Sequence, residues 1–392
     1  MFPQLPSPKH ILAKTISTLS FFIAGFASLA FQIVSFKLIS ASGLSDALSV
    51  AISLTGFVSL SGLGALLAAR VRRQPTAGLL EFLMGLYGLV IFGALFALGI
   101  EHVLGLLAGT TLGEKLVLFM FATGPLAFLS GMLIPLHQYR RGQFAIDPRR
   151  SDVPHEGKSD AGKGDFTNFA AVYFVFHAGG ALSLLLVETL AFPLVGWPLV
   201  GTLLAGLSAL NGLYVMLAAQ GQPTKPQTTQ SQKIKRHRLL PWLFLLSVLT
   251  GFAGIVSYKM FDFLVTPNIQ NYAVVTSLIF LAFTLTTIIA HQVKLTFRGI
   301  LSASGIGLLC FFLPIALVPM LAFPILEAGF SHWWIYGLAG GLLIIPAYTL
   351  IGLSVPSAVR LGVPSHQALF VVALGNALGY WLYILTAHYN VD

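Results

Sequence analysis

Residues 15–40 read TISTLSFFIAGFASLAFQIVSFKLIS, and this stretch decides the class of fold. Its one charged residue is Lys37, and it is longer than the roughly 20 apolar residues that a helix needs to cross a membrane. Backbone N–H and C=O groups in lipid must bond one another, which an α-helix achieves within a single segment. The stretch therefore predicts a transmembrane helix.

Similar apolar stretches follow along the whole chain, which is 56% hydrophobic and 9% charged. A soluble domain has roughly a quarter charged residues, so this composition indicates a protein solvated by lipid. We predict an all-α, polytopic integral membrane protein with about 11 transmembrane helices. Their expected ranges are 15–40, 47–69, 79–100, 116–136, 169–190, 199–219, 239–264, 272–290, 300–323, 333–356 and 367–387.

The basic residues predict the orientation of these helices, because Lys and Arg in short loops mark the cytoplasmic side. Every even-numbered connection is basic, as is the segment before the first helix, whereas the odd-numbered connections contain little beyond Lys115. We expect a cytoplasmic amino terminus, an outside carboxyl terminus, and a location in a cell membrane, specifically a bacterial inner membrane.

An internal repeat divides the chain. IVSFK at 33–37 returns as IVSYK at 255–259, and Pro125, Gly131 and Pro135 return with the same spacing as Pro346, Gly352 and Pro356. Similarity at one nearly fixed offset is typical of repeated structural units. Since the offset spans six crossings, the units are expected to be parallel, as in major facilitator transporters.

We therefore predict two major-facilitator-like pseudo-repeats of five helices plus a connecting helix. An N-terminal half would comprise residues 1–219 and a C-terminal half residues 239–392, joined by a basic cytoplasmic linker at 220–238.

The first helix also carries a family resemblance. Residues 25–39, GFASLAFQIVSFKLI, with Gln32 five residues before Lys37, resemble the membrane module of the fused major facilitator and spermidine synthase family. Asn376-Ala-Leu-Gly379 is similar to the Asn-x-x-Gly of that family's later helices. The fused pattern adds a soluble aminopropyltransferase domain after the last helix, and we expect no such domain here.

Two lysines are the most informative candidate functional residues. Lys37 and Lys259 occupy equivalent places in the repeat, near the expected outer ends of their helices. Their ammonium groups either reach the lipid headgroups, with the alkyl stems in the hydrocarbon, or flank an outward-facing cavity that attracts an anion. Under the second alternative the two lysines should face each other between the halves.

Three further polar residues complete the predicted substrate path. His177 lies among small residues inside a predicted helix. It is either a proton-responsive group or ligand contact, or a neutral histidine that bonds a neighbouring helix. Gln32 and Asn376 leave the same two alternatives open. Glu81 and Glu188 are expected to reach the interface from helix ends, so the sequence predicts no buried carboxylate.

Pro125, Pro135, Pro346 and Pro356 are candidate hinges, because proline removes a backbone hydrogen bond from a helix. A static kink is the alternative.

The sequence favours a transporter for a neutral or anionic small solute, because parallel repeats and paired prolines are typical of carriers. The absence of a predicted intramembrane carboxylate argues against proton-coupled cation transport. The alternative is a non-enzymatic membrane subunit that docks a partner protein, such as a separately encoded synthase or a biosynthetic or electron-transfer complex. No catalytic motif, metal-ligand set or cofactor motif is recognisable, and the scattered basic residues do not predict nucleic-acid binding.

Overall fold

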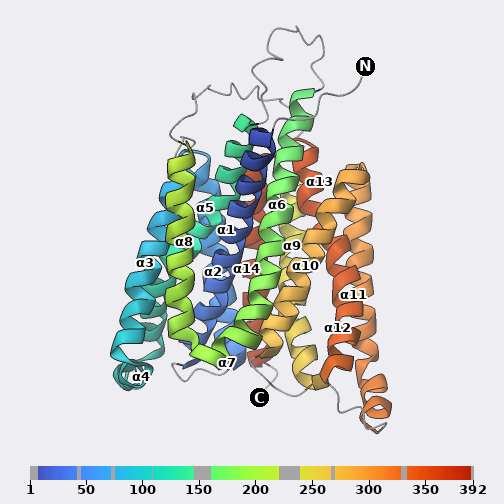
Figure 1. Cartoon of the computed structure of the whole chain (residues 1–392). Coiled ribbons are helices and arrows are strands. Elements are labelled where there is room, and N and C mark those ends of the chain that lie inside the picture. Colours follow the sequence, from blue (N-terminus) through green and yellow to red (C-terminus); the bar gives the residue numbers. More distant parts are fainter. Residues whose placement is uncertain are drawn as a thin grey trace.

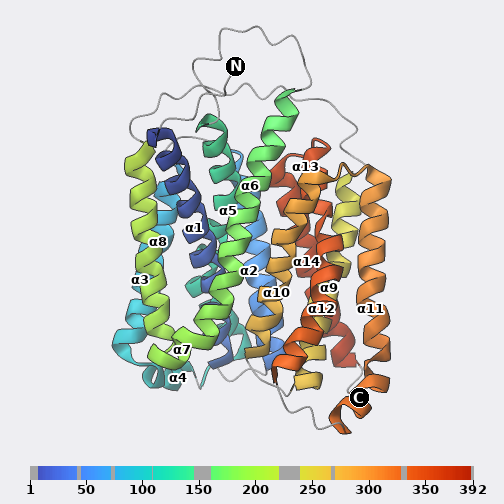
Figure 2. The same cartoon turned by 45° about the vertical axis from the view of Figure 1, so that its right-hand side comes forward.

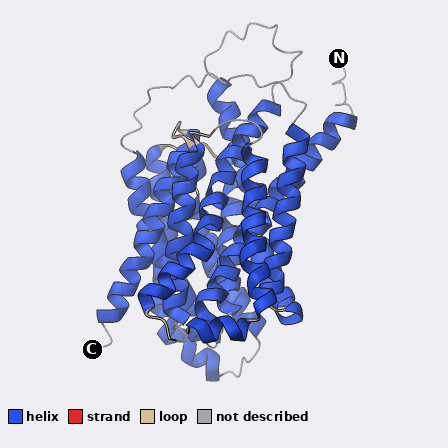
Figure 3. Ribbon diagram, turned by 90° about the vertical axis from the view of Figure 1, so that its left-hand side faces the viewer, coloured by secondary structure: helices blue, strands red, loops and turns tan. Residues whose placement is uncertain are grey.

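The computed structural model describes residues 8–41, 46–71, 76–107, 109–144, 160–219, 239–265, 270–327 and 333–389. Every regular element within these ranges is a helix (Figure 3). The predicted linker at 220–238 lies outside the described residues, so the proposed division at that linker stays a prediction.

The first group of helices covers the chain up to Ala219, and we refer to it as the N-terminal half. It comprises α1 (Pro8–Ala41), α2 (Asp46–Ala68), α3 (Thr76–Leu98), α4 (Ile100–Leu107), α5 (Leu112–Phe144), α6 (Asp160–Leu186), the π-helical turn η2 (Val187–Ala191), α7 (Phe192–Val195) and α8 (Trp197–Ala219).

The second group, the C-terminal half, begins at Leu239. It comprises α9 (Leu239–Val265), α10 (Gln270–Gln292), α11 (Phe297–Glu327), α12 (Trp333–Gly352), α13 (Ser354–Arg360) and α14 (Ser365–Tyr389). Over the described residues ten helices are long and apolar enough to cross a membrane, and α11 adds a shorter apolar segment, Phe297–Leu313. The predicted polytopic all-α architecture is confirmed.

The long helices run side by side in one bundle (Figures 1 and 2). Within the N-terminal half α3 packs on α8, α1 on α6, and α2 on α5. Within the C-terminal half α9 packs on α14, and α10 and α11 both pack on α12. The halves meet mainly where α2 packs on α14 and α6 packs on α10, and α13 also contacts α6.

The two ends of the bundle are distinguished by short elements. In Figure 1 the upper end contains the start of α1 and the helix α13, whereas the lower end contains α4 and α7. The distribution of Lys and Arg predicts that the upper end faces the cytoplasm, and we refer to it as the predicted cytoplasmic end.

Close helix contacts inside the N-terminal half depend on glycine. Gly25 of α1 lies against the carbonyl of Phe176 in α6, and Gly179 of α6 lies against the carbonyl of Phe22 in α1. A Cβ at either position would overlap that carbonyl, so this reciprocal pair fixes how closely α1 and α6 approach.

The repeated prolines have different effects in the two halves. Pro125 and Pro135 both lie inside the continuous helix α5, whereas the corresponding segment of the C-terminal half is interrupted at Leu353 between α12 and α13. Pro346 lies inside α12, and Pro356 lies in the first turn of α13, where its missing N–H is tolerated. The predicted single helix over 333–356 is therefore two helices, and whether any proline acts as a hinge stays a prediction.

The end of α6 also differs from the expected plain helix. After Leu186 the chain forms η2 and then α7, and Gly196 at φ +79° turns it into α8. Short π-helical turns inside longer helices occur frequently at functional sites. This one contains Glu188, which the sequence placed at the membrane interface.

Candidate functional site

Tyr272, near the start of α10, is the centre of the contacts that join the halves near the lower end of the bundle. Its side chain is 2% exposed, and Gln32 Nε2 of α1 donates a hydrogen bond to its hydroxyl oxygen at 3.1 Å. The predicted path residue Gln32 therefore bonds the opposite half.

Both copies of the repeated motif converge on Tyr272. The ring of Phe36, from IVSFK, lies 4.7 Å from the Tyr272 ring, and the ring of Tyr258, from IVSYK, lies 6.2 Å from it. The serines of the two motifs also behave alike, since Ser35 donates to the carbonyl of Phe31 and Ser257 to that of Ala253. Residues equivalent in the repeat thus surround one tyrosine.

Lys37 forms an ion pair and does not simply reach the lipid headgroups. Its Nζ lies 2.6 Å from Oε1 of Glu188, and the two side chains are 16% and 4% exposed. The ammonium also lies 5.5 Å from the centre of the Phe192 ring. The pair joins α1 to the π-helical turn inside the N-terminal half, so the positive charge of Lys37 is balanced by the negative charge of Glu188.

Lys259 lies beside the same cluster from the C-terminal half. Its Nζ is 5.7 Å from the centre of the Tyr258 ring, which in turn packs on Tyr272. The two predicted lysines are thus each adjacent in sequence to an aromatic residue that contacts Tyr272. No described distance joins the lysines directly.

His177 lies at mid-height of the interface between α6 and α10. Its Nδ1 is 2.7 Å from the carbonyl oxygen of Tyr173, one turn earlier in α6. Its ring lies 5.3 Å from that of Phe280 and 5.9 Å from that of Phe283, both in α10. The hydrogen bond is therefore local, and the contacts with the other half are aromatic.

Asn376 lies elsewhere, where α14 crosses α9. Its backbone is in contact with Gly251, and its Oδ1 has no hydrogen-bond partner among the described residues. Asn376 thus lies at a helix crossing inside the C-terminal half.

Three hydrogen bonds between side chains or backbone join the halves within the described residues. At the predicted cytoplasmic end Ser365 Oγ donates to Gln138 Oε1 at 2.5 Å. Nearer the opposite end Ser277 Oγ donates to the carbonyl oxygen of Ala181 at 2.7 Å, and Gln32 bonds Tyr272. In this conformation the halves are bonded to each other near both ends of the interface.

Two buried carboxylates contradict the sequence expectation. The side chain of Glu188 is 4% exposed and that of Glu81 is fully buried, with Asn211 Nδ2 donating to Glu81 Oε1 at 2.6 Å. The prediction was wrong because α3 begins at Thr76, three residues before the predicted span, and because the chain stays helical beyond Glu188. Nothing in the sequence of α3 alone reveals that Asn211 and His137 lie beside Glu81.

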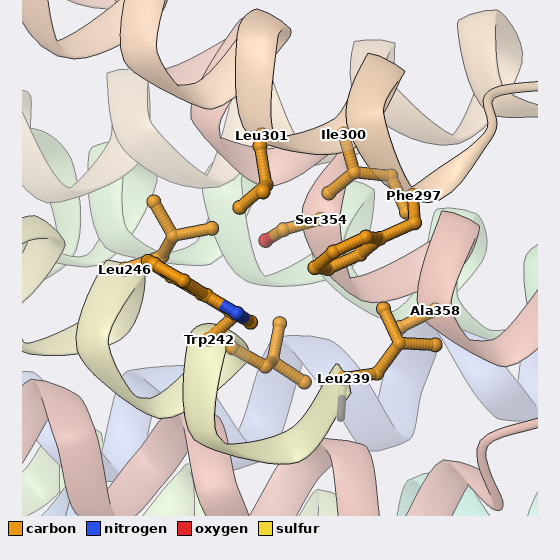
Figure 4. Close-up of a pocket in the computed structure, with 9 residues that line it drawn as sticks. Leu239, Trp242, Leu246, Phe297, Ile300, Leu301, Ser354 and Ala358 are labelled. Carbon is orange, nitrogen blue, oxygen red and sulfur yellow. The ribbon is translucent and has the colours of Figure 1, made fainter. Parts of the chain in front are cut away.

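A separate small recess lies between α9, α11 and α13 (Figure 4). Apart from the Ser354 hydroxyl and the Trp242 indole nitrogen its lining is apolar, formed by residues such as Leu246, Phe297 and Ile300. None of the predicted path residues lines it. Within the described chain no three His, Cys, Asp or Glu side chains come together as a metal site.

The chain matches no protein-family model and no curated protein sequence. Its fold is similar to solved transporter structures. A bacterial homologue of the human lysosomal transporter Spinster, in an inward-facing and unoccupied conformation, aligns with a TM-score of 0.51 and 13% identity over 98% of this chain and 84% of that one. The nucleoside transporter NupG aligns with a TM-score of 0.54 and 15% identity over 98% of this chain and 97% of that one. The chain thus has a major-facilitator-like fold.

Proposed function

We propose that this protein is an integral membrane transporter that moves a neutral or anionic small solute between its two halves. The observation that supports this most is the convergence of both repeated motifs on Tyr272, at the interface where the halves meet. A carrier of this fold exposes a site between two parallel repeats first to one side and then to the other. The orientation with a cytoplasmic amino terminus, in a bacterial inner membrane, is part of the proposal.

The groups at this interface favour a neutral solute over an anionic one. Gln32, Tyr272 and Ser277 offer uncharged hydrogen-bonding groups from both halves. The ammonium of Lys37, which otherwise attracts an anion, is already paired with Glu188. An anionic solute would depend on Lys259, the second lysine beside the cluster.

The relation to the fused major facilitator and spermidine synthase family is a narrower proposal. It rests on the motif of α1, including Gln32 and Lys37, and on Asn376 of α14. Gln32 bonds Tyr272 of the opposite half, and Lys37 is paired with Glu188, so both residues of the α1 motif make specific contacts inside the protein.

Uptake into vesicles tests the proposal. Purified protein is reconstituted in proteoliposomes and given a mixture of isotope-labelled nucleosides, sugars, amino acids and small carboxylic acids, and mass spectrometry identifies what enters. We expect one chemical class, uncharged at neutral pH, to accumulate above the level of protein-free vesicles. If no solute enters, the alternative of a subunit that docks a partner protein is favoured, and co-purification from native membranes identifies that partner.

Replacement of Tyr272 by Phe is expected to lower the rate of this uptake about fivefold, because it removes a buried hydrogen bond worth roughly 1 kcal/mol. The matched control is Tyr87→Phe, which removes a hydroxyl that bonds the carbonyl of Phe121 within the N-terminal half. Initial uptake rates of the two variants, at equal protein per vesicle, provide the measurement. Equal rates in Tyr272→Phe and Tyr87→Phe would contradict the placement of the site.

A further inference from the structure

The outward side of α9 and α11 is exposed, whereas the equivalent side of the N-terminal half is covered. At the sequence offset that relates Pro125 to Pro346, the first residue of α3 corresponds to the first residue of α11. In the N-terminal half α8 packs along α3 and also contacts α1. In the described part of the C-terminal half α11 packs on α12, α9 and α13, and its outward side is exposed. We refer to this side as the α9/α11 face, formed by Trp242, Leu249, Ile306, Leu309 and Leu313.

The side chains of this face do not favour another helix as its cover. Ile306 and Leu309 are 52% and 68% exposed, and at the same offset they correspond to Gly85 and Gly88 of α3, which are buried. A Cβ on Gly85 would overlap the backbone of Ala209 in α8. The glycines therefore permit the close approach of α8 to α3. Because branched side chains replace them on α11, a helix cannot pack there as closely.

The recess of Figure 4 lies beside the α9/α11 face at the predicted cytoplasmic end. Trp242 of α9, which is 47% exposed, and Phe297 of α11 line it, and the Ser354 hydroxyl of α13 lies between them (Figure 4). At the same offset Ser354 corresponds to Leu133 of α5, which is fully buried. The smaller serine side chain leaves space in an apolar lining, which suits a flexible chain of methylene groups.

The edge of the face at the predicted cytoplasmic end is basic. Arg298, directly after Phe297, is exposed, and so is Lys294 in the connection before α11. The stretches 239–246 and 293–301, which form this edge, contain no Asp or Glu. A basic residue close to the cytoplasmic leaflet enriches anionic lipid about fivefold. The charge of this edge therefore complements an anionic headgroup.

The thickness of one leaflet agrees with this arrangement. Half of the hydrocarbon layer is about 15 Å thick, which an α-helix crosses in about ten residues. Counted from Arg298 at the headgroups, the acyl chains of the cytoplasmic leaflet extend along α11 to about Leu309. Ile306 and the recess thus lie at the depth of the acyl chains of that leaflet.

We propose that the α9/α11 face binds one anionic phospholipid of the cytoplasmic leaflet. Its phosphate contacts Arg298, and one acyl chain lies between α9 and α11 and enters the recess beside Trp242. The lipid takes the place that α8 has in the other half. The site lies on the outside of the bundle, apart from the interface between the halves, so lipid binding does not depend on the identity of the solute.

Quenching of Trp242 by brominated lipid tests the proposal. A full-length variant that retains Trp242, with the other four tryptophans replaced by Phe, is reconstituted in phosphatidylcholine vesicles that contain a minor fraction of phosphatidylglycerol. Bromine in the acyl chains quenches indole fluorescence on contact. It is carried either by the phosphatidylglycerol or, in a parallel sample, by an equal fraction of the phosphatidylcholine. We expect brominated phosphatidylglycerol to quench Trp242 about fivefold more strongly.

Three controls locate the bound lipid. Trp381 of α14 is 46% exposed, so a variant that retains only this tryptophan should be quenched equally by the two lipids. Arg298→Gln should lower the preference of Trp242 for phosphatidylglycerol severalfold, whereas Arg70→Gln, which removes an exposed arginine after α2, should leave it unchanged. Ser354→Leu fills the recess without a change of charge and should also lower the quenching of Trp242.

Equal quenching of Trp242 by the two lipids would show contact with bulk lipid only and would overturn the proposal. So would a preference of the same size at Trp381, or one that Arg298→Gln leaves intact. Quenching by neither lipid would show that a second copy or a partner helix covers the face, which also contradicts the proposal. If Ser354→Leu does not fold, the comparison of Arg298→Gln with Arg70→Gln decides. The assay contains no solute, so its failure is distinguishable from a failure of the transport proposal.

Discussion

Replacement of Lys37 by Ala is expected to lower the free energy of unfolding by about 3–5 kcal/mol, because it leaves the carboxylate of Glu188 buried without its partner. The geometry supports an effect of this size. The Nζ–Oε1 distance is 2.6 Å, the Glu188 side chain is 4% exposed, and its second oxygen has no hydrogen-bond partner among the described residues. Unfolding by denaturing detergent, followed by circular dichroism, provides the measurement.

Two further variants distinguish the ion pair from a general effect of losing a lysine. Lys294→Ala removes an exposed lysine between α10 and α11 and should change stability by less than about 0.5 kcal/mol. The double variant Lys37→Ala/Glu188→Ala should be more stable than the sum of the single effects predicts, because no unpaired charge remains. Equal stabilities of Lys37→Ala and Lys294→Ala would contradict the buried pair.

Gly131→Ala is the second substitution with a large expected effect. Gly131 belongs to the repeated Pro-Gly-Pro pattern, and in α5 it lies against the backbone of Ser61 in α2. A Cβ there would overlap the Ser61 carbonyl, so α2 and α5 must move apart. We expect a loss of roughly 3 kcal/mol, at the upper end of the usual cost of overpacking, because the obstacle is backbone and cannot rotate away.

The control for this variant is Gly93→Ala in α3, where a Cβ would meet nothing within 4 Å. Alanine is a better helix former than glycine, so this change should stabilise the protein by up to about 1 kcal/mol. The same unfolding assay measures both variants. A Gly131→Ala protein as stable as Gly93→Ala would show that the repeated glycine does not mark a helix crossing.

The helices were predictable from sequence because each segment must cross the hydrocarbon layer and pair its own backbone polar groups, independently of the other segments. A run such as 239–264 must span the hydrocarbon whatever its neighbours are, and the observed helix α9 (Leu239–Val265) agrees within a residue. The break at Leu353 was not predicted, because Pro346 and Pro356 have the same spacing as two prolines that leave α5 continuous. Whether proline interrupts a helix depends on the packing around it.

The candidate sites were less predictable, because they depend on which helices meet. The repeated motif identified Lys37 and Lys259, but Tyr272, which the neighbouring motif residues Phe36 and Tyr258 contact, lies in a third helix outside the motif. In the sequence, Glu81 is an isolated polar residue near the start of a helix. In the structure, His137 of α5 and Asn211 of α8 lie beside it. Pairwise contacts between distant segments leave no periodic signal in one sequence.

The central claim is that the two halves separate and close again while a solute crosses, and one cross-linking experiment tests it most directly. Gln138 and Ser365, whose side chains meet at 2.5 Å between α5 and α14, are both replaced by cysteine in a Cys310→Ser background. A short, reducible dithiol reagent then bridges them, and solute uptake is measured in proteoliposomes before bridging, after bridging and after reduction. The account predicts that bridging lowers uptake to the level of protein-free vesicles and that reduction restores it. Undiminished uptake by fully bridged protein, with the bridge verified by mass spectrometry, would contradict the account.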